Sequence, residues 1–288
     1  MKRLIVNADD FGITHGVNRG ILRCYEQGIV TSATIMANGD GFDGAAEMAR
    51  AHPRLGVGVH IVLVGGRALG AQGKNGSLAD DTGELPKTIT ALISKSRSRA
   101  LFAHAVEAEI RAQIERALAG GIQPTHLDTH KHTHIYPPVM RALARVAREY
   151  NISRVRMPFE SVGAVWRGLG GIRLAFSGRS AFFLASQSNR PYFRRHLREN
   201  DLRSPQHFFG FFATGRLAHK ALLEIVRALP EGTSELVCHP GINDADLERQ
   251  STRLRAQRET EMAALTSPDV KQEIVERGVQ LISYRELN

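Results

Sequence analysis

Residues suited to metal binding are concentrated between Thr125 and His134, where four of the twelve histidines and one aspartate occur within ten residues. All five occupy even positions, namely His126, Asp128, His130, His132 and His134. On an extended strand the even positions share one face, because successive side chains alternate. Neutral imidazole and carboxylate are suitable ligands for zinc and related divalent metals. The stretch therefore predicts a metal site in preference to a His-rich surface loop.

A helix would also group part of this set, since His126, His130 and His134 are spaced at i, i+4 and i+8. However, Gly120-Gly121 ends the preceding helical pattern, and Pro137-Pro138 is typical of the first turn of the next helix. The span between these two signals is short and rich in threonine. We therefore expect a strand that ends near His130 and a loop that carries the rest.

Polar residues also end the other short apolar segments. We expect them at the carboxyl ends of strands at five places, which are Asp9-Asp10, His60, His130, Arg156 and His239. Neighbours on a strand point to opposite faces, so Asp9 and Asp10 converge only if the backbone turns, which Gly12 permits.

Helical patterns separate these strands. They cover residues 15–27, 42–51, 102–118, 138–150, 217–229, 253–265 and 268–277. Strands that alternate with helices imply a parallel sheet with right-handed crossovers, and therefore an α/β fold. In a βα barrel the carboxyl ends of the strands form the rim where active sites are built. The five polar positions are expected to meet at that rim.

Residues 161–200 differ from the rest of the chain. Seven arginines are interleaved with six aromatic residues, against a single acid, Glu199. We expect residues 161–210 to form an insertion or cap within a single catalytic domain that spans residues 1–288. A plain packed insertion is the alternative, equally compatible with this composition.

Overall composition is that of a globular protein, with 42% hydrophobic and 23% charged residues in 288. No stretch approaches the roughly 20 apolar residues of a membrane span, and two cysteines suggest no disulfide framework. We therefore expect a cytoplasmic protein. The formal charge of +9 favours anionic partners such as nucleic acid, phosphorylated substrates or the inner membrane leaflet, without choosing between them.

The rim residues suggest one reaction. If Asp10, His60 and His130 hold a metal, three protein ligands leave a position open for water or substrate. Such a metal activates water and polarises a carbonyl. Asp9 is then the natural general base, and His239 could protonate the leaving group. Arg156 could keep Asp9 ionised, and His126 and Asp128 could support a ligand from behind. His134 could line the groove, and His132 either contacts the substrate or supports a ligand. These parts describe metal-assisted hydrolysis of an amide or ester.

Four sequence blocks resemble the signature of the YdjC-like carbohydrate deacetylases. They are Asn7-Ala8-Asp9-Asp10-Phe11-Gly12, Gly58-Val59-His60, Pro124-Thr125-His126-Leu127-Asp128-Thr129-His130 and Cys238-His239-Pro240-Gly241. The resemblance implies a distorted βα barrel of the polysaccharide-deacetylase type. It implies Asp9 as base, Asp10, His60 and His130 as ligands of one divalent metal, and His239 as general acid. Zinc is favoured by the ligand set, although relatives have also been assigned magnesium.

Two departures point to one branch of that family. Chitooligosaccharide-type members usually carry histidine at the position of Lys131, and the segment 161–200 is unlike a simple sugar cleft. Both features are similar to the hopanoid-biosynthesis branch, HpnK, which implies an N-acetylglucosaminyl hopanoid as substrate. A lipid-linked substrate would bring the protein to the inner membrane face, where basic and aromatic residues favour peripheral contact.

Other functions are weighed against this one. A chitooligosaccharide deacetylase is the first alternative. A metal-dependent phosphoesterase is the second, although two-metal sites need more ligands than this set offers. A non-catalytic binder of nucleic acid or membrane surfaces is the third, and the intact metal and base set argues against it. We therefore expect an enzyme, and no nucleic-acid partner.

Overall fold

The computed structural model describes residues 1–70, 78–97, 99–160 and 187–288. The strands are β1 (Lys2–Phe11), β2 (Ser32–Ile35), β3 (Gly56–Ile61), β4 (Leu127–Thr129), β5 (His207–Phe209), β6 (Gly232–Cys238) and β7 (Gln280–Leu281). The α-helices are α1 (His15–Gln27), α2 (Phe42–Ala51), α3 (Ile89–Ser94), α4 (Arg99–Ala119), α5 (Pro137–Glu149), α8 (Arg190–Glu199), α9 (His219–Ala228), α10 (Ala245–Arg249), α11 (Ala256–Leu265) and α12 (Pro268–Glu276). The 3-10 turns within the described ranges are η1 (Lys95–Arg97), η2 (His130–Ile135), η3 (Gln187–Asn189) and η4 (Tyr284–Glu286).

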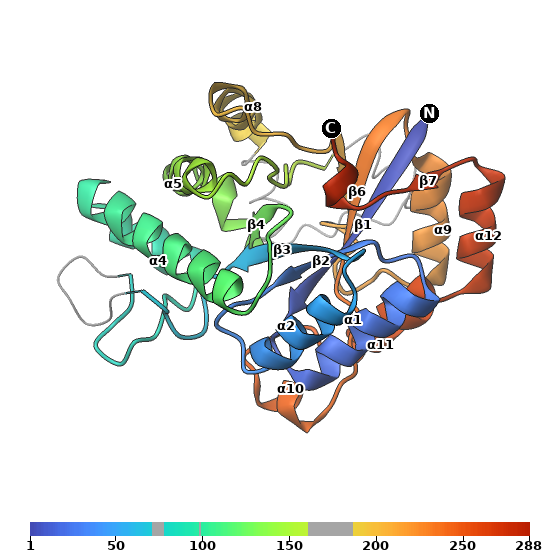
Figure 1. Ribbon diagram of the computed structural model, residues 1–288, viewed down its shortest axis with the longest axis horizontal. Helices are drawn as coiled ribbons and strands as arrows, with labels where there is room; N and C mark the ends of the chain where they lie inside the picture. Colours follow the sequence, from blue (N-terminus) through green and yellow to red (C-terminus); the bar gives the residue numbers. More distant parts are fainter. Residues whose placement is uncertain (71–77, 98, 161–186) are drawn as a thin grey trace.

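The strands form one curled parallel sheet in the order β4-β3-β2-β1-β6-β5 (Figure 1). Strand β1 is central, and its Leu4-Ile5-Val6 run is fully buried. The short strand β7 pairs with the first residues of β1, on the side where β2 takes over further along. The parallel α/β sheet predicted from the alternation of strands and helices is thus confirmed.

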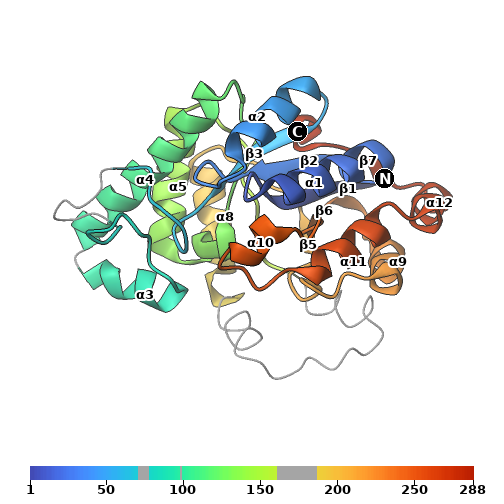
Figure 2. The ribbon, with the colours of Figure 1, turned by 90° about the horizontal axis from the view of Figure 1, so that it is seen from below.

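The helices pack around this sheet in neighbouring pairs (Figures 1 and 2). Helix α4 lies against α5, which packs on α8, while α1 packs between α2 and α11, and α9 contacts α11 and α12. Among the helices of the described ranges, none combines the length and apolar character needed to cross a bilayer.

Helix α1 illustrates how local sequence determines an element. The Thr14 side chain caps its start by accepting a hydrogen bond from the Val17 N–H, and the helix ends at Gly28. Its buried side includes Val17, Ile21 and Cys24, which recur at helical spacing. The helix predicted over residues 15–27 has these bounds in the structure.

One predicted strand differs from the structure. The strand expected to end at Arg156 is reduced to isolated bridges, from Val155 to Leu127 and from Arg154 to Arg203. Strand β4 ends at Thr129, which agrees with the prediction of a strand that ends near His130, and the chain then turns through η2 with left-handed backbone at Lys131 and His132.

Part of the predicted insertion, residues 161–186, lies outside the described residues. Its described remainder contains α8, which packs on α5, and then β5, which joins the sheet beside β6. The final residues of the 161–210 segment are therefore part of the sheet.

Candidate metal centre and active site

Two successive acids reach the site because β1 is irregular at its end. The register between β1 and β2 shifts between Ala8 and Phe11, and Asp10 adopts a left-handed φ of 66°. Gly12, with a φ of 96°, completes the turn. This bulge re-aims one side chain, so that Asp9 and Asp10 both face the same side. The predicted turn is present, and it involves Asp10 itself as well as Gly12.

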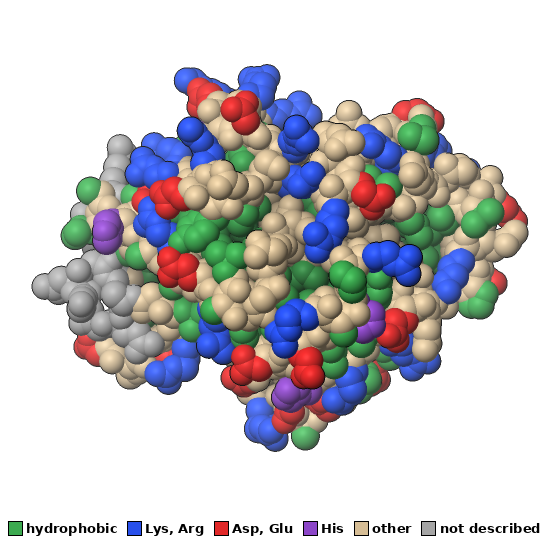
Figure 3. Space-filling model, in the orientation of Figure 1, with side chains coloured by type: hydrophobic (Ala, Val, Ile, Leu, Met, Phe, Trp, Pro, Cys, Tyr) green, Lys and Arg blue, Asp and Glu red, His purple; other side chains and the backbone are tan. Residues whose placement is uncertain are grey.

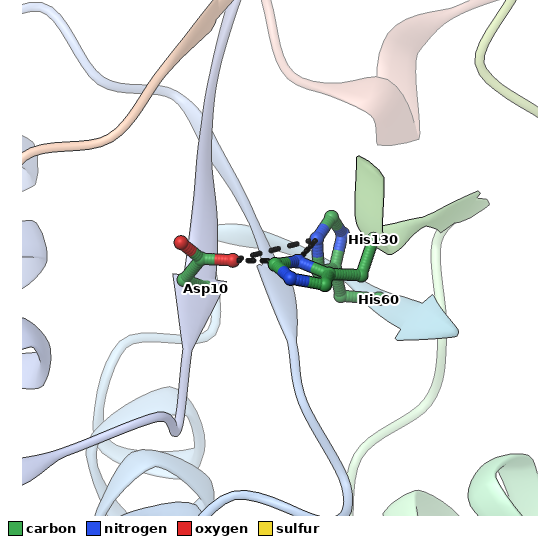
Figure 4. A group of neighbouring side chains, drawn as sticks. All are labelled: Asp10, His60 and His130. Atoms are coloured by element: carbon green, nitrogen blue, oxygen red, sulfur yellow. Dashed lines mark hydrogen bonds and ion pairs between the residues drawn. The ribbon is translucent and has the colours of Figure 1, made fainter. Parts of the chain in front are cut away.

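The three predicted metal ligands lie together. Asp10 Oδ1 is 3.5 Å from His60 Nε2 and 3.3 Å from His130 Nδ1, and these two nitrogens are 3.3 Å apart (Figure 4). Zinc bonds of about 2.0–2.2 Å in tetrahedral geometry place ligand atoms roughly 3.4 Å apart. Asp10 Oδ1 is buried and accepts no hydrogen bond from any described residue. The donor set and its spacing therefore fit one divalent ion.

Asp128 supports His60 from behind. Its Oδ1 lies 2.6 Å from His60 Nδ1, an arrangement that fixes ring orientation in many metal sites. Burial opposes a charge on His60, but Asp128 and Asp9 outweigh it and raise the His60 pKa to about 9. The negative charges that favour a proton on His60 also favour a metal cation beside it.

Asp9 is held by a buried arginine. Arg156 Nη1 and Nη2 donate to the two Asp9 oxygens at 2.8 and 2.7 Å. Burial opposes ionisation of Asp9, but Arg156 and His60 hold its pKa well below the usual range. Arg156 also contacts Asp128 Oδ2 at 2.6 Å and Glu235 Oε1 at 2.8 Å. One guanidinium thus orients both the candidate base and the carboxylate behind His60.

His239 follows β6 and faces the same centre. Its Nε2 is 4.0 Å from Asp9 Oδ2, and its Nδ1 is buried without a hydrogen-bond partner among the described residues. Burial is the main reason that its pKa falls to about 4, against the opposing influence of Asp9 and Asp10. A neutral imidazole beside the candidate base is suited to exchange a proton with a reacting group.

Two of the remaining histidines have packing contacts. The His126 ring stacks on Tyr284, with centroids 3.6 Å apart. His134 Nδ1 lies 2.5 Å from Thr129 Oγ1, and its Nε2 is 3.1 Å from the carbonyl oxygen of Arg156. Through these two contacts His134 connects the turn after β4 with the segment that carries Arg156.

A cleft of about 510 Å³ opens over the metal centre. Its floor includes Asp9, Asp10, His60, His130 and His239, and its walls include Ile89, Lys131, His132, Phe211, Thr214 and residues 251–254. His132 lines this cleft, whereas His134, for which that position was expected, is absent from its lining.

Sequence reasoning missed several residues that complete the site. Arg258 Nη2 donates to Asp10 Oδ2 at 2.6 Å, and Glu261 accepts the His239 N–H at 2.6 Å. Both are buried on one face of α11. The Tyr284 hydroxyl donates to Glu235 at 2.6 Å, and Glu235 in turn contacts Arg156. Arg258 and Glu261 are three residues apart, which places them on one face of a helix. This spacing was the available sequence signal, but it does not show whether that face is buried or exposed to solvent.

Arg258 also affects the charge of Asp10. Burial opposes ionisation of this carboxyl, but Arg258 and His130 hold its pKa well below the usual range. Asp10 is therefore present as the carboxylate, the form that binds metals.

Comparison with known proteins matches the whole chain to one family. The model of the YdjC-like proteins matches residues 3–276. A carbohydrate deacetylase from Geobacillus stearothermophilus is 36% identical over 98% of this chain and 96% of its own length. A chitooligosaccharide deacetylase from Salmonella paratyphi B is 32% identical over 99% and 98%.

A solved structure agrees in fold. An Enterococcus faecalis protein, assigned provisionally to cellobiose-phosphate cleavage, superposes with a TM-score of 0.75 at 27% identity, covering 99% of this chain and 98% of its own. The deacetylase relatives confirm the prediction of a hydrolase that acts on an amide bond. The chain belongs to the YdjC-like protein family.

Proposed function

We propose that this protein is a metal-dependent N-deacetylase that converts an N-acetylglucosamine-containing substrate to the free amine and acetate. The observation that carries this proposal is the ligand triangle of Asp10, His60 and His130 with ionised Asp9 beside it. The carbohydrate class of substrate is supported by the Geobacillus and Salmonella relatives.

The proposed mechanism assigns one task to each side chain. A divalent ion held by Asp10, His60 and His130 would supply Lewis acidity, lowering the pKa of water and polarising the acetamide carbonyl. Asp9, oriented by the Arg156 fork, accepts the proton of the attacking water. His239, neutral at rest, takes up the proton that Asp9 has accepted, since its Nε2 lies 4.0 Å from Asp9 Oδ2, and delivers it to the sugar nitrogen as the C–N bond breaks, which releases acetate and the amine. Because Arg156 lowers the pKa of Asp9, this carboxylate is a weak base and can accept a proton only from a water whose own pKa is lowered.

For the specific substrate we propose an N-acetylglucosaminyl hopanoid, a bacteriohopanetetrol glycolipid. Apolar side chains at the cleft, Ile89, Phe211 and Leu254, support an apolar aglycone. Basic side chains gather over α5 and α8 (Figure 3), where the exposed arginines are Arg141, Arg145, Arg148, Arg194, Arg195 and Arg198. Such a surface favours peripheral contact with an anionic membrane face, each basic residue contributing about 1 kcal/mol. We further propose one catalytic domain over residues 1–288, with 161–210 as its insertion or cap.

A chitooligosaccharide substrate is the second candidate, favoured by the Salmonella relative at 32% identity. Acetate release separates the two candidates. The panel contains diacetylchitobiose, a short alkyl N-acetylglucosaminide and the N-acetylglucosaminyl hopanoid in detergent, with zinc or magnesium supplied. We expect the hopanoid to have the highest kcat/KM. Preference for diacetylchitobiose would select the second candidate, and acetate from none of the three would reject the deacetylase.

A further inference from the structure

The two oxygens of the Asp10 carboxylate have different surroundings. Oδ1 faces the imidazoles of His60 and His130 and accepts no hydrogen bond from a described residue. Oδ2 points the other way (Figure 4) and accepts a hydrogen bond from Arg258 Nη2 at 2.6 Å. One oxygen is thus free for a metal, while the other is engaged by a charge-assisted hydrogen bond.

The Arg258 guanidinium is fixed in place. Its side chain is fully buried on α11, and its Nε donates to the carbonyl oxygen of Leu254 at 3.1 Å. Its Cδ lies so close to Gly241 that a Cβ added to this glycine would be 3.1 Å from it. Packing and hydrogen bonding together therefore leave Arg258 little freedom to release Asp10 Oδ2.

We infer that Arg258 is a positioning residue that makes Asp10 a one-oxygen metal ligand. A carboxylate can bind a metal through one or both oxygens. If Oδ2 were free, it could turn towards the ion as an additional ligand, which would raise the coordination number and block the approach of the substrate to the ion. Arg258 prevents this by engaging Oδ2, and so preserves the open position of a catalytic site. The inference rests on the proposed metal centre.

A role as simple counter-charge makes a different prediction. A lysine at position 258 would supply the same charge, but its single nitrogen cannot reproduce the two fixed directions towards Asp10 and Leu254. A counter-charge role predicts that lysine restores wild-type behaviour. A positioning role predicts that lysine leaves part of the defect.

The test uses Co²⁺ as a spectroscopic probe of coordination in the full chain. Visible d–d absorption is recorded for the wild type and for Arg258→Met, and it weakens as the coordination number of Co²⁺ rises. We expect Arg258→Met to bind Co²⁺ with weaker absorption and to lose about 10- to 100-fold in kcat for acetate release. Arg258→Lys should show the same change to a smaller extent.

A matched control is Arg227→Met, which removes an arginine paired with Glu273 at 2.8 Å on the outer helices. It should keep the wild-type spectrum and kcat. A wild-type spectrum in Arg258→Met would overturn the inference, as would complete restoration by Arg258→Lys. If Arg258→Met does not fold, a wild-type spectrum in Arg258→Lys has the same meaning. Absence of Co²⁺ binding by the wild type would instead reject the metal centre itself, and with it the inference.

Discussion

At the scale of residues, the centre is a network of buried charges around Arg156. This side chain is fully buried, and it contacts the carboxylates of Asp9, Asp128 and Glu235. A buried charge is tolerated only when it is paired and hydrogen-bonded, so each of these carboxylates depends on the guanidinium. The network holds the candidate base and the support of His60 in one rigid frame.

The role of Asp9 can be tested with Asp9→Asn. Asparagine has nearly the same size and can still accept a hydrogen bond from Arg156, but it cannot take a proton from water. We expect metal content to stay at the wild-type level while kcat for acetate release falls by about 10²–10⁴-fold. Turnover at the wild-type rate would show that another group acts as the base.

At the scale of elements, the site is assembled where parallel strands end. Asp9 and Asp10 lie among the last three residues of β1, His60 is the penultimate residue of β3, and His239 directly follows β6. Because parallel strands place their carboxyl ends at one edge, the sequence positions of these residues were enough to predict their meeting. The glycine at position 28 likewise made the end of α1 predictable.

Other elements could not be predicted because their sequence signals are weak. Strand β5 has only three residues and follows an arginine-rich segment, so no periodicity identifies it. The contribution of α11 was hidden because Arg258 and Glu261 stand among exposed polar neighbours. Their burial depends on tertiary contacts with Asp10 in β1 and with His239 after β6, which a single helix pattern does not contain.

Glu261 provides a prediction for α11. Its oxygens accept the backbone N–H groups of His239 at 2.6 Å and Gly215 at 3.0 Å. In Glu261→Gln one oxygen becomes an NH2 group, so only one of the two backbone N–H groups keeps its acceptor and the other faces a donor, and the segments that carry His239 and Gly215 should shift relative to each other. We expect kcat to fall by up to about 10²-fold with unchanged metal content.

The matched control is Glu259→Gln, which makes the same exchange on the exposed side of the helix at a residue that accepts the Asn243 N–H. It should keep wild-type kcat. Equal kcat values for the two variants would show that Glu261 does not position His239.

At the scale of the whole molecule, several buried carboxyls connect stability to pH. Glu160 accepts the N–H groups of Gly210 at 3.2 Å and Phe212 at 3.0 Å, in the segment that follows β5. Burial outweighs these hydrogen bonds and raises the Glu160 pKa from 4.5 to about 7. Between these pH values the folded protein binds more protons than the unfolded chain, so this group lowers stability as pH rises.

Glu160→Gln tests this contribution. The variant keeps an acceptor oxygen but has no charge to bury, so its stability relative to the wild type should increase as pH rises from about 4.5 to 7. The full increase, reached above pH 7, corresponds to about 3 kcal/mol in the free energy of unfolding, and about 2 kcal/mol of it falls between pH 5 and pH 7.5. Urea unfolding of both proteins at pH 5 and pH 7.5 measures it. A constant difference between the two proteins across this interval would contradict the assignment.

The central claim is that one divalent ion is held by Asp10, His60 and His130. The most direct test is the metal content of wild-type protein and His130→Ala after chelator treatment, reloading with zinc and gel filtration, measured by plasma mass spectrometry. We predict about one zinc per chain for the wild type and little or none for His130→Ala, because the variant loses one of three protein ligands. Equal zinc content in the two proteins, or none in the wild type, would contradict this account.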